Sequence, residues 1–123
     1  DLQQIAQLII KECKGVYTVK FIGLEMLGNA RRNLNDVWID YKESFSKMKS
    51  AIDLLVKNEI DVGIYNYPLC CVDQPYWSLC EKSITDYKVR YLPQCNQCIK
   101  KDACGGMFNG TYNLMKGVIE PIL

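Results

Sequence analysis

Seven cysteines and no histidine constrain this chain of 123 residues more than any other feature. Six of the cysteines follow Pro68, and three of them form a C-x2-C-x5-C pattern at Cys95, Cys98 and Cys104, followed by two glycines. Two thiolates three residues apart can turn toward one metal centre, and glycines let the backbone approach a bulky inorganic group. The second half is therefore predicted to be a cysteine-rich, metal-binding tail of loops and short helices.

The spacing alone leaves the occupant of this site open. A [4Fe-4S] cluster and a structural zinc both take four thiolates, and disulfides or free thiols are the third alternative, although an odd number of cysteines cannot all pair. A zinc ribbon usually has two C-x2-C knuckles and only one is present, which favours the cluster. The fourth ligand must then lie upstream, where Cys70, Cys71 and Cys80 are available. Cys13 lies on the apolar face of a predicted helix, so we expect it to be buried.

Composition excludes several functions. Without histidine there is no Ser-His-Asp or Cys-His catalysis and no His-ligated zinc. The net charge of +1 gives no field that would favour nucleic acid as a partner, and no apolar run reaches the roughly 20 residues of a membrane span. Metal binding by cysteines suits a reducing compartment, which predicts a cytoplasmic location. The chain begins inside a predicted helix and without Met, which suggests a piece of a longer protein.

The first half has the periodicities of an α/β fold. Apolar spacing and β-rich runs predict a helix over residues 2–13, strands over 16–22, 37–41 and 60–65, and a helix from about 41 to 58 that begins with a capping box at Asp40 and Glu43. A helix between strands implies that the strands are parallel, and ligands then meet their carboxyl ends, where Glu25 and Asn66 lie. Further on, short helices are predicted over residues 83–91 and 112–115.

Several segments in this order resemble the C-terminal part of radical SAM enzymes, namely Phe21–Glu25, Trp38–Asp40, Ile64–Cys70, Ser83–Lys88 and the C-x2-C-x5-C-G-G run. Together they are similar to the peptide maturases of His-Xaa-Ser repeat systems over residues 16–122. The resemblance implies a partial (β/α) barrel with parallel strands over residues 1–67 and an auxiliary cluster-binding region over 68–123.

The same resemblance implies site residues. The cysteine core is similar to SPASM-type and twitch-type extensions, so Cys95, Cys98 and Cys104 match ligands of an auxiliary [4Fe-4S] cluster. Cys70 is the preferred fourth ligand because it ends the Asn-Tyr-Pro-Leu-Cys segment, with Cys71 and Cys80 as alternatives. Glu25 and Asn66 would contact S-adenosylmethionine or substrate; the plainer alternative is a loop carboxylate and a turn-forming amide.

The chain also departs from these families. Phe108 stands where SPASM tails carry another cysteine, and no glycine lies between Cys70 and Cys80, so we expect a single cluster. No three cysteines have the C-x3-C-x2-C spacing that cleaves S-adenosylmethionine, so the chain alone is expected to be inactive.

The resulting hypothesis is the C-terminal portion of a peptide-modifying enzyme. Its partners would be the missing N-terminal half, which uses S-adenosylmethionine, and a ribosomal peptide substrate. Strand edges left open at residues 16–22 and 60–65 predict self-association of the isolated chain. The alternatives are a non-catalytic binding module stapled by zinc and a small iron–sulfur electron carrier.

Overall fold

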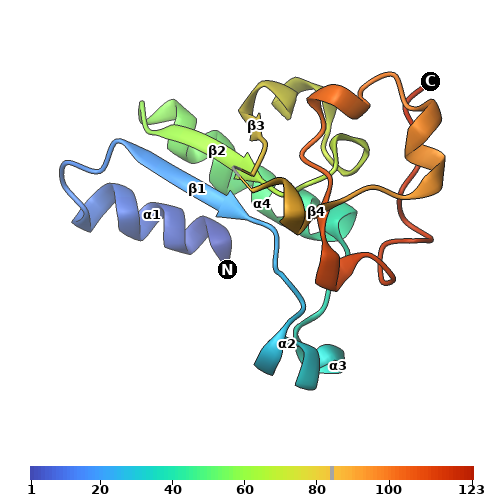
Figure 1. Cartoon of the computed structure of the whole chain (residues 1–123). Coiled ribbons are helices and arrows are strands. Elements are labelled where there is room, and N and C mark those ends of the chain that lie inside the picture. The colour runs from blue at the N-terminus through green and yellow to red at the C-terminus, as the bar shows by residue number, and fades with distance from the viewer. Residues whose placement is uncertain (84) are drawn as a thin grey trace.

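The computed structural model describes residues 1–83 and 85–123 (Figure 1). It has a mixed α/β fold with a parallel sheet, which confirms the predicted fold class at this level. The helices are α1 (Leu2–Glu12), α2 (Gly28–Arg32), α3 (Leu34–Val37) and α4 (Tyr41–Lys57). The strands are β1 (Thr18–Ile22), β2 (Asp61–Tyr65), β3 (Cys80–Glu81), β4 (Val89–Arg90) and β5 (Met107–Phe108). Short 3₁₀ helices are η1 (Leu69–Cys71), η2 (Gln74–Leu79), η3 (Asp86–Lys88), η4 (Pro93–Gln97), η5 (Lys101–Ala103) and η6 (Asn109–Thr111).

The main sheet has the strand order β1-β2-β3, with both neighbouring pairs parallel. Thr18 lies opposite Asp61 and Ile22 opposite Tyr65, so β1 and β2 end together. Because α4 lies between β1 and β2 in the chain, the connection is the helical crossover that parallel strands require. The predicted strands at residues 16–22 and 60–65 are confirmed, with slightly later starts.

Helix α4 forms for the two reasons that the sequence indicates. The Asp40 carboxylate accepts a hydrogen bond from the Glu43 backbone N–H at 2.9 Å, which satisfies a free donor of the first turn. Side chains at helical spacing then cover the sheet; the buried ones are Tyr41, Phe45, Met48, Ala51, Ile52 and Leu55. Val56 of the same helix is 49% exposed.

Three other predicted elements are wrong. Residues 37–41 form no strand, because α3 ends at Val37 and the cap at Asp40 starts α4 only three residues later. In the region 83–91 the only helical residues are those of the 3₁₀ helix η3, β4 follows it, and Ile84 lies outside the described residues. Residues 112–115 belong to a run of hydrogen-bonded turns over residues 112–118.

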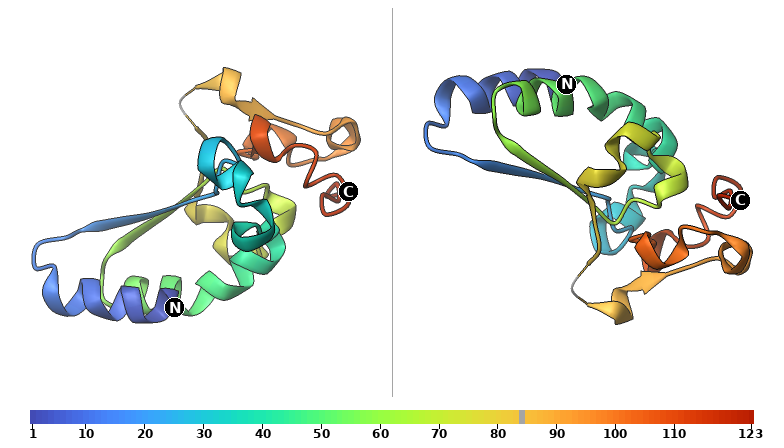
Figure 2. Two further views of the ribbon diagram at one scale, coloured as in Figure 1. Left: turned by 90° about the horizontal axis from the view of Figure 1, so that it is seen from below. Right: turned by 90° about the horizontal axis from the view of Figure 1, so that it is seen from above.

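The sheet is covered on one side only. Helices α1 and α4 pack together on one face of β1 and β2, and no helix formed by the described residues lies over the other face (Figure 2). That bare face carries an ion-pair network, in which Lys20 Nζ lies 2.8 Å from Glu81 Oε1 and 3.2 Å from Asp61 Oδ2. The Tyr65 hydroxyl also donates to Glu81. The network therefore spans all three strands.

The tail packs at the carboxyl ends of the strands (Figure 2). A Cβ placed on Gly105 would come within 3.2 Å of the carbonyl oxygen of Glu81 and 3.8 Å of the backbone nitrogen of Asn66. Strands β4 and β5 pair antiparallel within the tail. Among residues 1–83 and 85–123, no helix combines the length and hydropathy needed to cross a membrane.

Replacing Gly23 tests how closely the two strand ends approach. A Cβ there would lie 2.8 Å from the carbonyl oxygen of Asn66 and 3.0 Å from the Tyr41 hydroxyl. We expect Gly23→Ala to lower the free energy of unfolding by about 1–3 kcal/mol, because backbone must move to admit the methyl group. Gly117→Ala is the matched control, since nothing lies within 4 Å of its Cβ position. Urea denaturation of both variants measures the difference, and equal stabilities would contradict the described contact.

Candidate metal centre

Two consecutive 3₁₀ turns arrange the three cysteines of the C-x2-C-x5-C pattern. Helix η4 begins at Pro93 after the buried Leu92, and the Cys98 N–H donates to the carbonyl of Cys95 at 3.1 Å. Helix η5 then ends where the Cys104 N–H donates to the carbonyl of Lys101, also at 3.1 Å. The Tyr91 hydroxyl donates to the carbonyl of Cys104 at 2.8 Å and holds the loop from the side.

The chain that follows β2 brings Cys70 to this loop. Asn66 has a positive φ of 59°, which turns the backbone away from the strand direction. Helix η1 follows, and the indole N–H of Trp77 fixes it by donating to the carbonyls of Leu69 and Val72 at 3.0 and 2.8 Å. The N–H of Leu69 donates to Cys104 Sγ at 3.4 Å, which joins the two segments directly.

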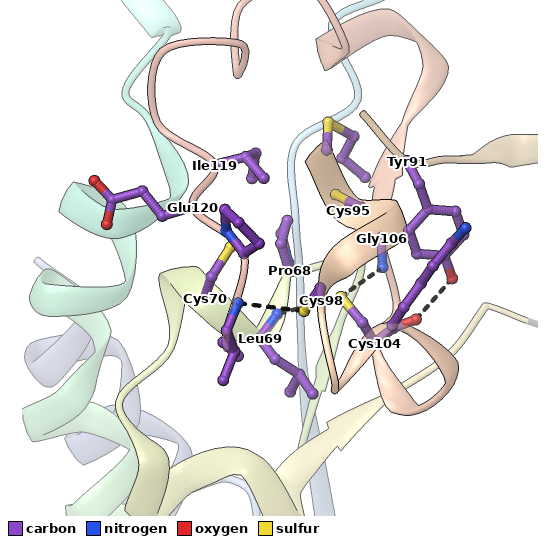
Figure 3. A pocket seen from close by; sticks show the side chains of 14 residues that line it. Pro68, Leu69, Cys70, Tyr91, Cys95, Cys98, Cys104, Gly106, Ile119 and Glu120 are labelled. Atoms are coloured by element: carbon purple, nitrogen blue, oxygen red, sulfur yellow. Dashed lines mark hydrogen bonds between the residues drawn. The ribbon is translucent and has the colours of Figure 1, made fainter. Parts of the chain in front are cut away.

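Cys70, Cys95, Cys98 and Cys104 line one cavity (Figure 3). The cavity is small, with a volume of about 20 Å³. These are the four cysteines selected from the sequence, and 25 residues separate Cys70 from Cys95 along the chain. The rest of the lining is mainly apolar backbone and side chains, including Pro68, Met107 and the C-terminal residues 119–122.

Backbone amides point at two of the sulfurs. Cys104 Sγ accepts from the N–H of Gly106 at 3.4 Å as well as from Leu69, and Cys98 Sγ accepts from the N–H of Ile122 at 3.4 Å. Gly106 can make this turn because its φ is 62°, a region that side chains rarely adopt. Such N–H donors stabilise negative charge on sulfur, which thiolates bound to metal carry.

The thiols differ in their ease of ionisation. Burial raises the pKa of Cys104, although the amide hydrogen bonds to its sulfur oppose the change, and burial likewise raises the pKa of Cys95. A hydrogen bond between the thiols of Cys70 and Cys71 lowers the pKa of Cys70 and raises the pKa of Cys71. Of Cys70, Cys95 and Cys104, Cys70 is therefore the thiol that ionises most readily before metal binds.

The donor set has the chemistry that sulfur-ligated metal groups use. Four thiols line the cavity and backbone amides donate to two of them, and hydrogen bonds of this kind are common around the sulfurs of iron–sulfur clusters. In the part of the chain that the structure describes, no three Cys, Asp or Glu side chains lie close enough together to hold a single metal ion.

The other three cysteines lie away from the cavity. Cys71 is 4% exposed within the hydrophobic core, and Cys80 lies half-buried in β3, with its thiol donating to the carbonyl of Tyr76 at 3.8 Å. The expectation that Cys13 is buried is wrong, because α1 ends at Glu12 and leaves Cys13 exposed in the turn toward Gly15. Of the three upstream candidates for the fourth ligand, Cys70 alone lines the cavity.

Glu25 and Asn66 lie just beyond the carboxyl ends of β1 and β2, which the parallel arrangement predicts. The N–H of Gly23 donates to the carbonyl of Tyr65 at 2.9 Å, so the segments that follow β1 and β2 begin side by side. Asn66 is 3% exposed, and its Nδ2 is the one buried side-chain nitrogen or oxygen without a hydrogen-bond partner among the described residues. Neither residue lines the cysteine cavity.

Sequence reasoning missed the C-terminal wall of the cavity. Ile119, Glu120, Pro121 and Ile122 line it, yet they carry no cysteine, charge pattern or spacing that indicates a metal centre. Comparisons with protein-family models, with curated proteins and with solved structures find no match to this chain. The case for a metal centre therefore rests on the geometry of the cavity.

Thiol labelling of the metal-free chain tests the cysteine environments. At pH 7 we expect a maleimide to modify the exposed Cys13 first and Cys71 last, because burial and a raised pKa both suppress the Cys71 thiolate. Peptide mass spectrometry at successive times measures each rate. Labelling in urea is the control, since unfolding should bring the two rates together. Native rates that are already equal would contradict the burial of Cys71.

Proposed function

We propose that this chain binds one [4Fe-4S] cluster through Cys70, Cys95, Cys98 and Cys104. The observation that carries the proposal is that these four thiols, and no other cysteine of the chain, line the same cavity. The amide donors to Cys98 and Cys104 support it, because they suit sulfur that carries negative charge. When bound, the cluster would supply a one-electron redox centre and would cross-link the loops of the tail.

We further propose that the chain is the C-terminal portion of a radical SAM peptide-modifying enzyme of the reducing cytoplasm. Residues 1–67 would contribute strands and helices to a partial (β/α) barrel, and residues 68–123 would form its auxiliary cluster region. The one-sided sheet supports this, because a barrel has helices outside and a face turned inward. The cavity at the carboxyl ends of the strands supports it too, since ligands meet parallel sheets there.

In this proposal two roles, cleavage of S-adenosylmethionine and presentation of the peptide, are divided between the halves of the enzyme. The N-terminal half would hold the cluster that cleaves S-adenosylmethionine, and the portion described here would present a ribosomal peptide, with Glu25 and Asn66 facing cofactor or substrate. The chain alone would be inactive. If the cavity held zinc instead, the chain would be a non-catalytic binding module whose loops are cross-linked by the metal. If it held a cluster but did not belong to an enzyme, the chain would be a small electron carrier.

Metal analysis tests the cluster directly. Protein purified without oxygen should contain about four iron and four sulfide per chain and show a brown visible absorption. Single changes to Ala at Cys70, Cys95, Cys98 or Cys104 should remove most of the iron. The matched controls are Cys13→Ala and Cys80→Ala, which remove thiols that do not line the cavity and should leave the iron content unchanged.

The alternatives give different results in the same assay. One zinc and no sulfide, even after reconstitution with iron and sulfide, would reject the cluster and favour the binding module. Loss of iron from Cys80→Ala with retention in Cys70→Ala would reject the ligand set. A cluster that cycles between oxidised and reduced forms without losing iron would keep the electron-carrier alternative in place, and irreversible loss would remove it.

We also propose that the isolated chain self-associates through the edge of β1. Pairing within the described residues leaves the outer edge of β1 open. The edge at residues 60–65, also expected to be open, is partly covered, because β3 pairs with Ile64 and Tyr65 of β2. Ile22, at the end of β1, is 64% exposed. Open edges with apolar side chains pair with other strands.

Light scattering over a range of concentrations tests this self-association. The unmodified chain should form dimers or larger species, and Ile22→Lys should shift it toward the monomer because a charge opposes edge pairing. Val56→Lys changes another exposed apolar residue, on α4 and away from the edge, and should leave the association unchanged. A monomer at every concentration would contradict the proposal.

A further inference from the structure

The C-terminal residues 119–122, here termed the strap, form one wall of the cysteine cavity. The strap is anchored at its start by Ile119, which is 5% exposed and whose N–H donates to the carbonyl of Met115 at 3.1 Å. In its middle, Glu120 Oε2 lies 3.3 Å from Lys42 Nζ on α4. The strap therefore lies between α4 and the cysteine loop (Figure 3).

Ile122 exchanges two hydrogen bonds with the cysteine loop. Its N–H donates to Cys98 Sγ at 3.4 Å, and its carbonyl accepts from the N–H of Ile99 at 2.9 Å. The second bond fixes the backbone of Ile122 and so holds its N–H toward the sulfur. Pro121, which precedes it, has no N–H and a restricted φ, which limits other conformations of the strap.

Hydrogen bonds to the sulfurs of a cluster affect its reduction potential. Reduction adds negative charge, which spreads to the thiolate sulfurs, so a donor held near a sulfur stabilises the reduced form more than the oxidised form. The apolar side chains of Ile119 and Ile122 act on the same centre by limiting access of water. These two effects can be separated, because the first depends on a backbone N–H and the second on side-chain bulk.

We infer that the strap is a working part of the metal centre, in which the Ile122 N–H is a fixed donor that raises the reduction potential of a cluster bound through Cys98. Ile122 is a positioning residue and not a ligand. The inference rests on the proposed function, since it requires a cluster in the cavity. It goes beyond that proposal by assigning a redox role to a segment without any metal-binding side chain.

Two substitutions at one position test the strap. Ile122→Pro removes the N–H and keeps an apolar side chain, whereas Ile122→Val keeps both the N–H and the apolar character. Each is made in the chain as described and loaded with iron and sulfide, and the potential is measured by a redox titration followed by visible absorption and electron paramagnetic resonance. We expect a lower potential in Ile122→Pro and the unmodified value in Ile122→Val. Equal potentials in the two variants would overturn the inference.

A labelling experiment needs no disruptive substitution. The chain is produced with ¹⁵N-isoleucine, and the reduced cluster is examined by pulsed electron paramagnetic resonance. Ile99 and Ile119 also carry the label near the cavity, so we expect weak ¹⁵N couplings of which one is lost in Ile122→Val, where the same N–H is present on an unlabelled residue. An unchanged coupling in Ile122→Val, or none in the unmodified chain, would overturn the inference even if Ile122→Pro fails to fold.

Failure of the strap inference and failure of the proposed function give separate results. Iron and sulfide are counted on the unmodified chain before any potential is measured. Zinc alone at that stage rejects the cluster, and the strap inference with it. A full cluster whose potential does not respond to the Ile122 N–H rejects the strap inference alone.

Discussion

The parallel pairing of β1 and β2 is the constraint on which the rest of the molecule depends. It requires α4 to cross between the strands, and it brings both carboxyl ends to one edge of the sheet. The segment from Asn66 to Cys70 leaves that edge and meets the cysteine loop through the bond from the Leu69 N–H to Cys104 Sγ. Without the parallel register, the thiol of Cys70 would have no fixed relation to the other three.

The sequence predicts those features that depend on local chemistry or strict periodicity. The N-cap at Asp40, the apolar face of α4 and the two long strands are of this kind, and all are present. The C-x2-C-x5-C spacing likewise predicts a shared centre, because short turns leave few ways to arrange three thiols. The family resemblance favours Cys70 as the fourth ligand; Cys70 lines the cavity, and its ligand role stays a prediction.

Other features depend on tertiary contacts that leave no local pattern. Cys13 has the spacing of a buried residue but lies where α1 ends, so the turn exposes it. Strands β3, β4 and β5 have two residues each and exist only because a partner lies beside them. The strap contributes backbone amides, and every residue except proline has one, so its place at the cavity cannot be read from residue types.

The bare face of the sheet has a consequence for whatever comes to lie over it. Gly63 has no side chain at the centre of β2, and a Cβ there would lie 2.5 Å from Glu81 Oε1 and 2.7 Å from Lys20 Nζ, so the missing methyl group is what lets the two charges meet above the strand. Burying this pair under apolar chain would strip its hydration at a cost that the mutual attraction does not reliably offset. This face of the sheet therefore favours contact with water. An apolar partner that packs closely on it is disfavoured, whereas a solvated space that holds polar groups is compatible with the ion pair.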